Sequence, residues 1–335
     1  MRGRVLVAGI GGGGDVGSAH CVATYLRELG YRVFLASVVW ERMVRDPVPG
    51  PISPKEVQGA EQYNWIAVVR GGEFSLREGK KVEPEAALLA KATGESVILL
   101  DLTGGYYSLY QSFLEAIELT GSDIVIGVDA GGDVLAMPGD DDVWSPLTDS
   151  IALAVLQDLE TSQLAVVGPG CDGEMPTEKV LRRISMVWKN GGNLGGFVIS
   201  RNLKEVCERA MKFMKTEASR VVLRAASGEF GEVEIRRGSR KLLLSPVLAT
   251  TFFLDPKKVQ SPLANAVRGT KSIEEASAKM LENCSVSELE LEKILKKLGE
   301  PTKENLEKAR ETLLKMRRCS DASNLQREEM ERFKD

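Results

Sequence analysis

One local pattern recurs along the chain and constrains its fold: a short apolar run that ends in glycines and an acidic residue. The pattern reads VLVAGIGGGGD from Val5, IVIGVDAGGD from Ile124 and LAVVGPGCDGE from Leu164, with helix-like segments between the runs. Buried runs of about four to eight residues that alternate with helices are typical of βαβ units, which form parallel sheets covered on both faces. The pattern therefore predicts an α/β protein with a doubly wound, mainly parallel, Rossmann-like sheet.

The predicted elements divide the chain into three parts. Residues 201–270 form a small α+β extension that completes the core and includes a hairpin of 232–236 with 241–244. Residues 271–335 are rich in Lys and Glu and form a charged helical C-terminal element whose Leu, Ile and Met side chains face inward. Residues 1–200 form the Rossmann-like ligand-binding domain, with strands expected at 4–8, 31–39, 65–69, 96–101, 123–128 and 164–167.

Composition narrows the classes of function. The chain has 335 residues with 44 basic and 48 acidic side chains, and its net charge of −4 argues against broad nucleic-acid binding. No apolar stretch approaches the ~20 residues that cross a bilayer, and the N-terminus lacks a signal-peptide core. We therefore expect a cytoplasmic protein that binds neither nucleic acid nor a membrane. Formation of a homo-oligomer stays open.

Histidine and cysteine usage restricts the chemistry further. His20 is the only histidine, which excludes multi-histidine metal sites and any Ser-His-Asp triad not built on His20. The five cysteines are widely spaced, form no CxxC pair and are therefore expected to be reduced thiols. They are Cys21, Cys171, Cys207, Cys284 and Cys319. Metal sites made of carboxylates remain open.

The first glycine loop, Gly9–Gly17, holds two overlapping GxGxxG matches and so raises a dinucleotide-binding fold. Two details argue against a site that binds NAD(P). The acid expected about 20 residues further on, at the end of the second strand, is missing, because Ser37–Trp40 stands there. Asp15 would also place a carboxylate where the pyrophosphate binds, although this residue is equally interpreted as a helix N-cap. No Gly-Lys-Ser/Thr follows the glycines, so a P-loop is excluded.

The acids of the repeated loops are expected to meet at one site, because the carboxyl ends of parallel strands share one edge of the sheet. Mg²⁺ is bound by one or two carboxylates together with phosphate oxygens. We assign the metal to Asp129 and Asp133, and catalysis to Asp133, Asp172 and Glu174. The residues assigned to a phosphate or other ligand are Gly11, Gly12, Gly13, Gly14, Asp15, Arg70, Gly104, Gly131, Gly132 and Gly170.

A plainer interpretation of these loops stays open. Each acid then caps the helix that follows it, and the glycines only form tight turns. Two further acidic features are assigned outside the site. The run Asp140–Asp142 is expected to be solvated, and Asp149 is expected to act as a first-turn acid of its helix.

Several motifs occur together: GGGGDVGSA near the start, VDAGGD after a mid-chain strand, SPLTDS at the next helix, and GPGCDGE. Over about residues 4–270 the chain resembles a mainly archaeal family, domain of unknown function family 1152. The resemblance implies an α/β protein and supplies no catalytic residues.

The residues favour a Mg²⁺-dependent enzyme that acts on a nucleotide or another phosphorylated small metabolite by phosphoryl transfer or hydrolysis. Two alternatives stay open. One is an NAD(P)-type dinucleotide-binding enzyme, and the other is a non-catalytic ligand sensor whose helical tail binds a partner.

Overall fold

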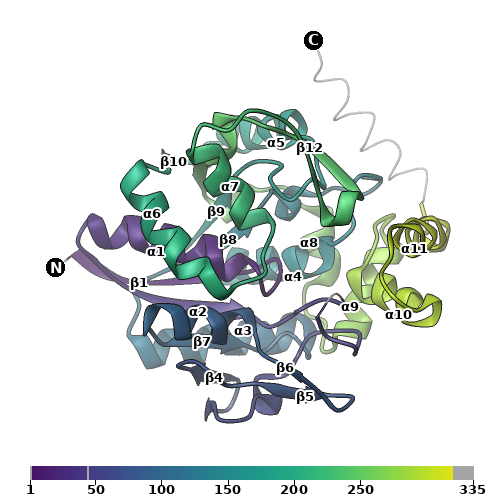
Figure 1. Ribbon diagram of the computed structural model, residues 1–335, viewed down its shortest axis with the longest axis horizontal. Helices are drawn as coiled ribbons and strands as arrows, with labels where there is room; N and C mark the ends of the chain where they lie inside the picture. Colours follow the sequence, from purple (N-terminus) through teal and green to yellow (C-terminus); the bar gives the residue numbers. More distant parts are fainter. Residues whose placement is uncertain (1, 44, 320–335) are drawn as a thin grey trace.

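The computed structural model describes residues 2–43 and 45–319 and is built on a nine-stranded sheet of order β10-β13-β9-β8-β1-β2-β7-β4-β3 (Figure 1). The five central strands, from β9 to β7, run parallel, and the strands at both margins join them antiparallel. The predicted α/β fold with a mainly parallel sheet is confirmed. The strands are β1 (Arg2–Gly9), β2 (Tyr31–Val38), β3 (Glu61–Gln62), β4 (Ile66–Val69), β7 (Val97–Leu100), β8 (Ile124–Ala130), β9 (Ser162–Val167), β10 (Asn193–Val198) and β13 (Thr250–Leu254).

Helices cover both faces of this sheet (Figure 1). Along β1, Val5 and Val7 join the apolar cluster of one face, and Leu6 and Ala8 join that of the other, which explains the unbroken apolar run. The first face carries α1 (Asp15–Glu28), α2 (Glu85–Thr93), α6 (Arg201–Ala210) and α7 (Ala218–Ala226). The second carries α3 (Gly105–Thr120), α4 (Pro146–Asp158), α5 (Thr177–Lys189), α8 (Pro262–Val267) and α9 (Ile273–Glu282).

The order of the parallel strands reverses between β1 and β8. From β1 the chain proceeds through β2 to β7 on one side, and then crosses over to β8 and β9 on the other. The loops after β1 and β8 therefore diverge above two neighbouring strands. Such switch points leave a crevice at the carboxyl edge of an open α/β sheet, where ligands bind.

Three smaller units lie outside the sheet. Two are hairpins, β5 (Ser75–Arg77) with β6 (Lys80–Val82), and β11 (Gly231–Ile235) with the expected partner β12 (Arg240–Leu244). The third is the pair α10 (Glu288–Leu298) and α11 (Lys303–Met316), which packs around Trp144 in a separate apolar cluster. Figure 1 shows α10 and α11 beyond the carboxyl end of β1, opposite the N-terminus.

Two expectations about this architecture are wrong. The segment around 65–69 was expected to be a parallel strand, but β4 runs antiparallel to β7, so it ends at the edge opposite the other glycine–acid loops. Cys284 and Cys319 form a disulfide instead of remaining thiols. Cys21, Cys171 and Cys207 are free and buried, as expected.

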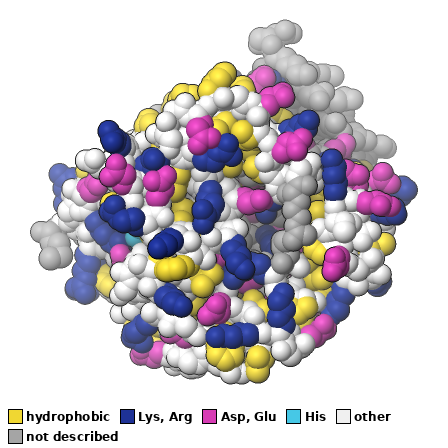
Figure 2. Space-filling view, in the orientation of Figure 1, with side chains coloured by type: hydrophobic (Ala, Val, Ile, Leu, Met, Phe, Trp, Pro, Cys, Tyr) yellow, Lys and Arg dark blue, Asp and Glu magenta, His cyan; other side chains and the backbone are white. Residues whose placement is uncertain are grey.

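On the face shown in Figure 2, basic and acidic side chains are intermingled, and hydrophobic side chains occur in small separate groups. This distribution gives that face no large patch of one charge. Among the described residues, no helix combines the length and apolar character that crossing a membrane requires.

Candidate functional site

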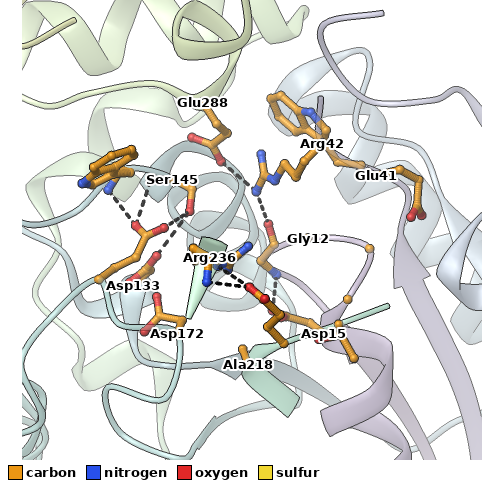
Figure 3. Close-up of a pocket in the computed structure, with 18 of the residues that line it drawn as sticks. Gly12, Asp15, Glu41, Arg42, Asp133, Ser145, Asp172, Ala218, Arg236 and Glu288 are labelled. Carbon is orange, nitrogen blue, oxygen red and sulfur yellow. Dashed lines mark hydrogen bonds and ion pairs between the residues drawn. The ribbon is translucent and has the colours of Figure 1, made fainter. Parts of the chain in front are cut away.

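A cavity of about 500 Å³ lies at the switch point of the sheet. Its walls come from the loops after β1, β2, β8 and β9, the start of α4, the β11–β12 hairpin, and α10 and α11 (Figure 3). Eleven acidic and five basic side chains line it. Acids therefore outnumber bases inside a partly enclosed space.

Asp15, Asp129 and Asp149 form a first group of carboxylates, in which one oxygen of each lies within 4.8 Å of the others. Asp15 opens α1, and its Oδ2 accepts a hydrogen bond from the Gly11 N–H at 2.9 Å. Asp129 lies at the end of β8 and accepts from the Val134 N–H at 3.3 Å. Asp149 comes from the first turn of α4. Three separate elements of the fold therefore converge on one small volume.

Asp133, Asp172 and Glu174 form a second group with the same spacing of 4.8 Å or less. Glu174 is held firmly, because its Oε2 accepts from the backbone N–H groups of Trp144 and Ser145 at 2.6 and 3.0 Å. The Ser145 hydroxyl lies 2.8 Å from Glu174 Oε1 and 3.5 Å from Asp133 Oδ2. Figure 3 places Asp133 and Asp172 on one side of the site and Asp15 on the other.

Burial shifts the protonation of both groups. It raises the pKa of Asp15 to about 7 and that of Asp172 to about 6. Burial, with neighbouring carboxylates adding to it, holds the pKa well above the usual range at three more positions, Asp129, Asp133 and Asp149.

Glu174 is the exception among these six acids. Burial raises its pKa too, but the guanidinium of Arg240 and a hydrogen bond with Asp133 outweigh burial and lower the pKa to about 2. The second group therefore combines one carboxylate whose pKa is lowered with a neighbour, Asp133, whose pKa is raised by burial and by the surrounding carboxylates.

Three aspartates of these groups lack some of the partners that buried acids need. Among the described residues, Asp133, Asp149 and Asp172 each keep one buried carboxylate oxygen that has no hydrogen-bond partner. A buried charge without a partner is strongly unfavourable unless an ion of opposite sign joins it. The donor set consists of carboxylate oxygens alone, which suits a hard divalent cation such as Mg²⁺.

The glycines of the loops are needed because carboxylates occupy the space beside them. A Cβ on Gly11 would lie 2.6 Å from Asp15 Oδ2 and 2.8 Å from Asp149 Oδ1. A Cβ on Gly131, whose φ is +126°, would lie 2.3 Å from Asp172 Oδ1. Gly11 and Gly131 thus admit the acids themselves, which differs from the expected role of cradling a phosphate.

The first glycine loop still offers an anion site at its far end. Gly14 occupies the N-cap position of α1, so the expected N-cap role of Asp15 is wrong, and no side chain of the described residues caps this helix. Uncapped N–H groups at a helix N-terminus attract phosphates. Gly12, Gly13 and Gly14 all line the cavity.

Arginines line the cavity beside the acids. Arg42 donates from Nη2 to the Gly11 carbonyl at 2.9 Å and lies 3.5 Å from Glu288 Oε1 (Figure 3). Arg240 lies 3.5 Å from Glu174 Oε1 and stacks on the Trp144 ring, 3.9 Å from its centroid. Arginine side chains of this kind bind phosphate oxygens through several N–H groups at once.

Arg236, which precedes β12, reaches the same cavity from a strained backbone position. Its φ is +53°, which is unusual for a residue other than glycine. Strained residues of this kind concentrate at functional sites, where the surrounding structure holds them in place.

The C-terminal helices are part of the site. Glu288 of α10 accepts hydrogen bonds from the Leu147 and Thr148 N–H groups at 2.8 and 2.9 Å, and so caps the helix that carries Asp149. Glu292 is also buried and lines the cavity. A Lys/Glu-rich helix is expected to expose its charged side chains; this expectation is wrong for Glu288 and Glu292, whereas Lys296 and Lys297 of the same helix are exposed.

Some of the predicted site residues line the cavity, and others lie outside it. Gly11–Gly14, Asp15, Asp129, Asp133, Asp172 and Glu174 all line the cavity. Arg70 lies at the opposite edge, with 61% of its side chain exposed and Glu61 as its ion-pair partner. Four glycines pack against neighbouring residues and do not line the cavity: Gly104, Gly131, Gly132 and Gly170.

Sequence reasoning missed several residues of the site. Asp149 was assigned to a first turn, although the SPLTDS motif that contains it was already conspicuous. The run Asp140–Asp142 lies outside the cavity, as expected, but only Asp141 is exposed, because Asp140 and Asp142 pair with Lys179. The remaining missed residues stand in segments without any distinctive motif: Arg42, Arg236, Arg240, Glu288 and Glu292.

Fold and site together define an open α/β protein with a carboxylate-rich cavity at the switch point of its sheet. The chain belongs to the family described as Protein of unknown function (DUF1152), whose model matches residues 6–296. The family resemblance of the motifs is thereby confirmed. No curated protein and no solved structure matched the chain.

Proposed function

We propose that this protein is a divalent-metal-dependent enzyme, with Mg²⁺ as its ion, that transfers or hydrolyses phosphoryl groups of a nucleotide or another phosphorylated small metabolite. One observation carries the proposal. Six carboxylates, five of them buried and that of Asp15 half-buried, form two groups in one cavity, and three of the six keep an oxygen without a partner among the described residues. Paired metal ions held by carboxylates are the usual catalysts of in-line displacement at phosphorus.

Each group would hold one ion, the first through Asp15, Asp129 and Asp149 and the second through Asp133 and Asp172. Bound ions would supply charge stabilisation to the oxygens of the reacting phosphoryl group. Glu174 already has hydrogen-bond partners at both oxygens, so its role is to position Ser145 and Arg240 beside that ion. Asp172, with its free Oδ1, is the best placed of the acids to accept a proton from an attacking water.

The surroundings of the acids support an anionic substrate. The uncapped start of α1 and three arginines lie around the carboxylates, so a phosphate bound there meets donors on one side and metal ions on the other. An NAD(P)-type cofactor has less support. Asp15 and Asp149 fill the space beside Gly11 that a pyrophosphate would approach.

The test combines metal binding with turnover in the full chain. Isothermal titration with Mg²⁺ is expected to show binding that Asp129→Asn weakens at least about tenfold. The matched control is Asp141→Asn, because Asp141 is exposed and pairs with Arg317 away from the cavity. Phosphate release from a panel of nucleotides and sugar phosphates is expected to require Mg²⁺ and to stop with EDTA. Absence of Mg²⁺ binding, or turnover unaffected by EDTA, would overturn the proposal.

A further inference from the structure

The cavity has a second, apolar end beside the carboxylates. Leu291 and Leu295 of α10 and Leu306 of α11 line it, and Trp144 joins them from the acidic side. Aliphatic side chains offer a phosphate no hydrogen bond or charge. They are stabilised by contact with an apolar or flat surface of a ligand. This part of the lining suits an apolar or flat group better than a phosphate.

Two unsatisfied polar atoms of opposite character border this part of the cavity. Arg42 Nη1 is a donor without a partner, and Glu292 Oε1 is an acceptor without a partner, among the described residues. Glu292 is 4% exposed, so it has little contact with bulk solvent. Unpaired buried groups are costly, and sites of ligand recognition are where such groups persist.

Trp40 holds both groups in place. Its Nε1 donates to Glu292 Oε2 at 2.9 Å, and the Arg42 guanidinium lies over its ring, 4.6 Å from the centroid. Glu292 Oε2 also accepts from the Gly50 N–H at 2.8 Å, which leaves only Oε1 free. Arg42 Nη2 is committed to the Gly11 carbonyl, which leaves Nη1 free. One buried indole thus fixes one donor and one acceptor for the same ligand.

We propose that this end of the cavity binds the base of a nucleotide, and that it selects bases with a lactam edge, a ring N–H next to a carbonyl. The ring N–H donates to Glu292 Oε1, the carbonyl accepts from Arg42 Nη1, and the ring lies against Leu291 and Leu295. Guanine, hypoxanthine and uracil present this edge. In the same orientation, adenine and cytosine place a bare ring nitrogen against Glu292 Oε1 and an amino group against Arg42 Nη1, which leaves both protein groups unpaired.

The inference rests on the proposed function, because the diphosphate of the same nucleotide occupies the acidic end of the cavity. Its test is titration calorimetry with Mg²⁺ and the full chain. The ligands are α,β-methylene analogues of GDP, UDP, ADP and CDP, with methylenediphosphonate as a base-free probe. The tighter of the GDP and UDP analogues is expected to bind at least about tenfold more tightly than the ADP and CDP analogues, as expected when unpaired groups oppose the wrong ligand.

Glu292→Gln separates base recognition from phosphate binding. The amide oxygen has to accept from Trp40 and Gly50, so an NH₂ group replaces the free acceptor, and the preference for lactam bases is expected to fall below about twofold. Affinity for methylenediphosphonate is expected to stay unchanged. Glu290→Gln is the matched control, because Glu290 lies on the same helix, pairs with Lys293 and does not line the cavity. If Glu292→Gln fails to fold, as thermal melts would show, Arg42→Lys removes the free donor instead and is expected to lose the preference likewise.

The results of these titrations test the lactam inference separately from the proposed function. Equal affinity for all four nucleotide analogues, or tightest binding of the ADP or CDP analogue, overturns the lactam inference and leaves the proposed function standing. If the nucleotide analogues bind no more tightly than methylenediphosphonate, the lactam inference is also overturned and the proposed function again stands. If neither methylenediphosphonate nor any nucleotide analogue binds in a Mg²⁺-dependent way, the proposed function fails, and the inference fails with it.

Discussion

At the scale of single residues, the site contains carboxylates that repel one another. Five aspartates, four of them buried, lie close together, and the basic side chains of the cavity are largely committed to other acids, such as Arg45 to Glu41 and Glu85. Functional sites commonly lower the stability of the fold in this way, because the arrangement suits a ligand that is bound only part of the time. Substitutions at the site should therefore separate stability from binding.

Asp149→Asn is expected to stabilise the metal-free protein at pH 8. The raised pKa of Asp149 means that its charged form is disfavoured in the folded state, so stability is lost as the pH rises above the carboxyl's ordinary value. Removing the ionisable group removes this loss, so the free energy of unfolding at pH 8 is expected to rise. Urea unfolding in EDTA measures the gain, and the same variant should lose stabilisation by Mg²⁺. A variant that is less stable in EDTA and still stabilised by Mg²⁺ would contradict this interpretation.

His20, away from the cavity, also makes the stability of the fold depend on pH. Its effect is opposite to that of Asp149, because it lowers the free energy of unfolding as the pH falls. It is buried, and burial lowers its pKa to about 4, because its ring nitrogens have no partner among the described residues. The unfolded chain binds a proton near pH 6.5 and the folded chain only near pH 4, so His20 costs stability as the pH falls through this window.

The variant His20→Leu isolates that term. Its free energy of unfolding minus that of the wild type is expected to be constant above about pH 7. Between about pH 6.5 and 4 the difference should move in favour of the variant by up to about 3 kcal/mol. Denaturant titrations at several pH values measure it. A difference that does not change with pH would show that His20 takes up its proton equally in both states.

At the scale of elements, α10 connects the C-terminal region to the catalytic side of the sheet. Glu288 caps the start of α4, where Ser145 occupies the N-cap position without capping, because its hydroxyl bonds Glu174. The first turn of the helix that carries Asp149 is thus fixed by a residue that lies 140 positions after Thr148 in the chain.

Glu288→Gln is expected to weaken Mg²⁺ binding about tenfold while the protein stays folded. The amide retains one acceptor for the first turn of α4 but replaces the other with a donor, so α4 and Asp149 lose part of their fixed position. Titration calorimetry measures the affinity, and circular dichroism checks the fold. The exposed acid Glu304 of α11, which pairs with Lys308, offers Glu304→Gln as a control without effect on affinity. Equal metal affinity in both variants would contradict a positioning role for Glu288.

At the scale of the whole molecule, the sheet topology explains how residues far apart in sequence form one site. The loops after β1, β8 and β9 carry acids that meet only because these strands lie side by side. The repeated glycine–acid pattern was enough to predict this convergence, since a parallel sheet places all three loops at one edge. The acids Asp15, Asp129, Asp133, Asp172 and Glu174 could be placed from the sequence for that reason.

The rest of the site could not be predicted, for identifiable physical reasons. Strand direction leaves no mark on an apolar run, so Arg70 was placed at the wrong edge once β4 was taken as parallel. A Lys/Glu-rich helix is typical of a solvated surface, and only tertiary packing shows that Glu288 and Glu292 are buried. The pairing of Cys284 with Cys319 depends on how α9 and α11 lie, which spacing does not reveal.

The most direct test of the account is a crystal of the full chain soaked in Mn²⁺, which replaces Mg²⁺ at carboxylate sites and scatters anomalously. The account predicts two anomalous peaks in the cavity. One should lie among Asp15, Asp129 and Asp149, and the other among Asp133, Asp172 and Glu174. Crystals saturated with Mn²⁺ that show peaks only on the surface, and none between these carboxylates, would contradict it.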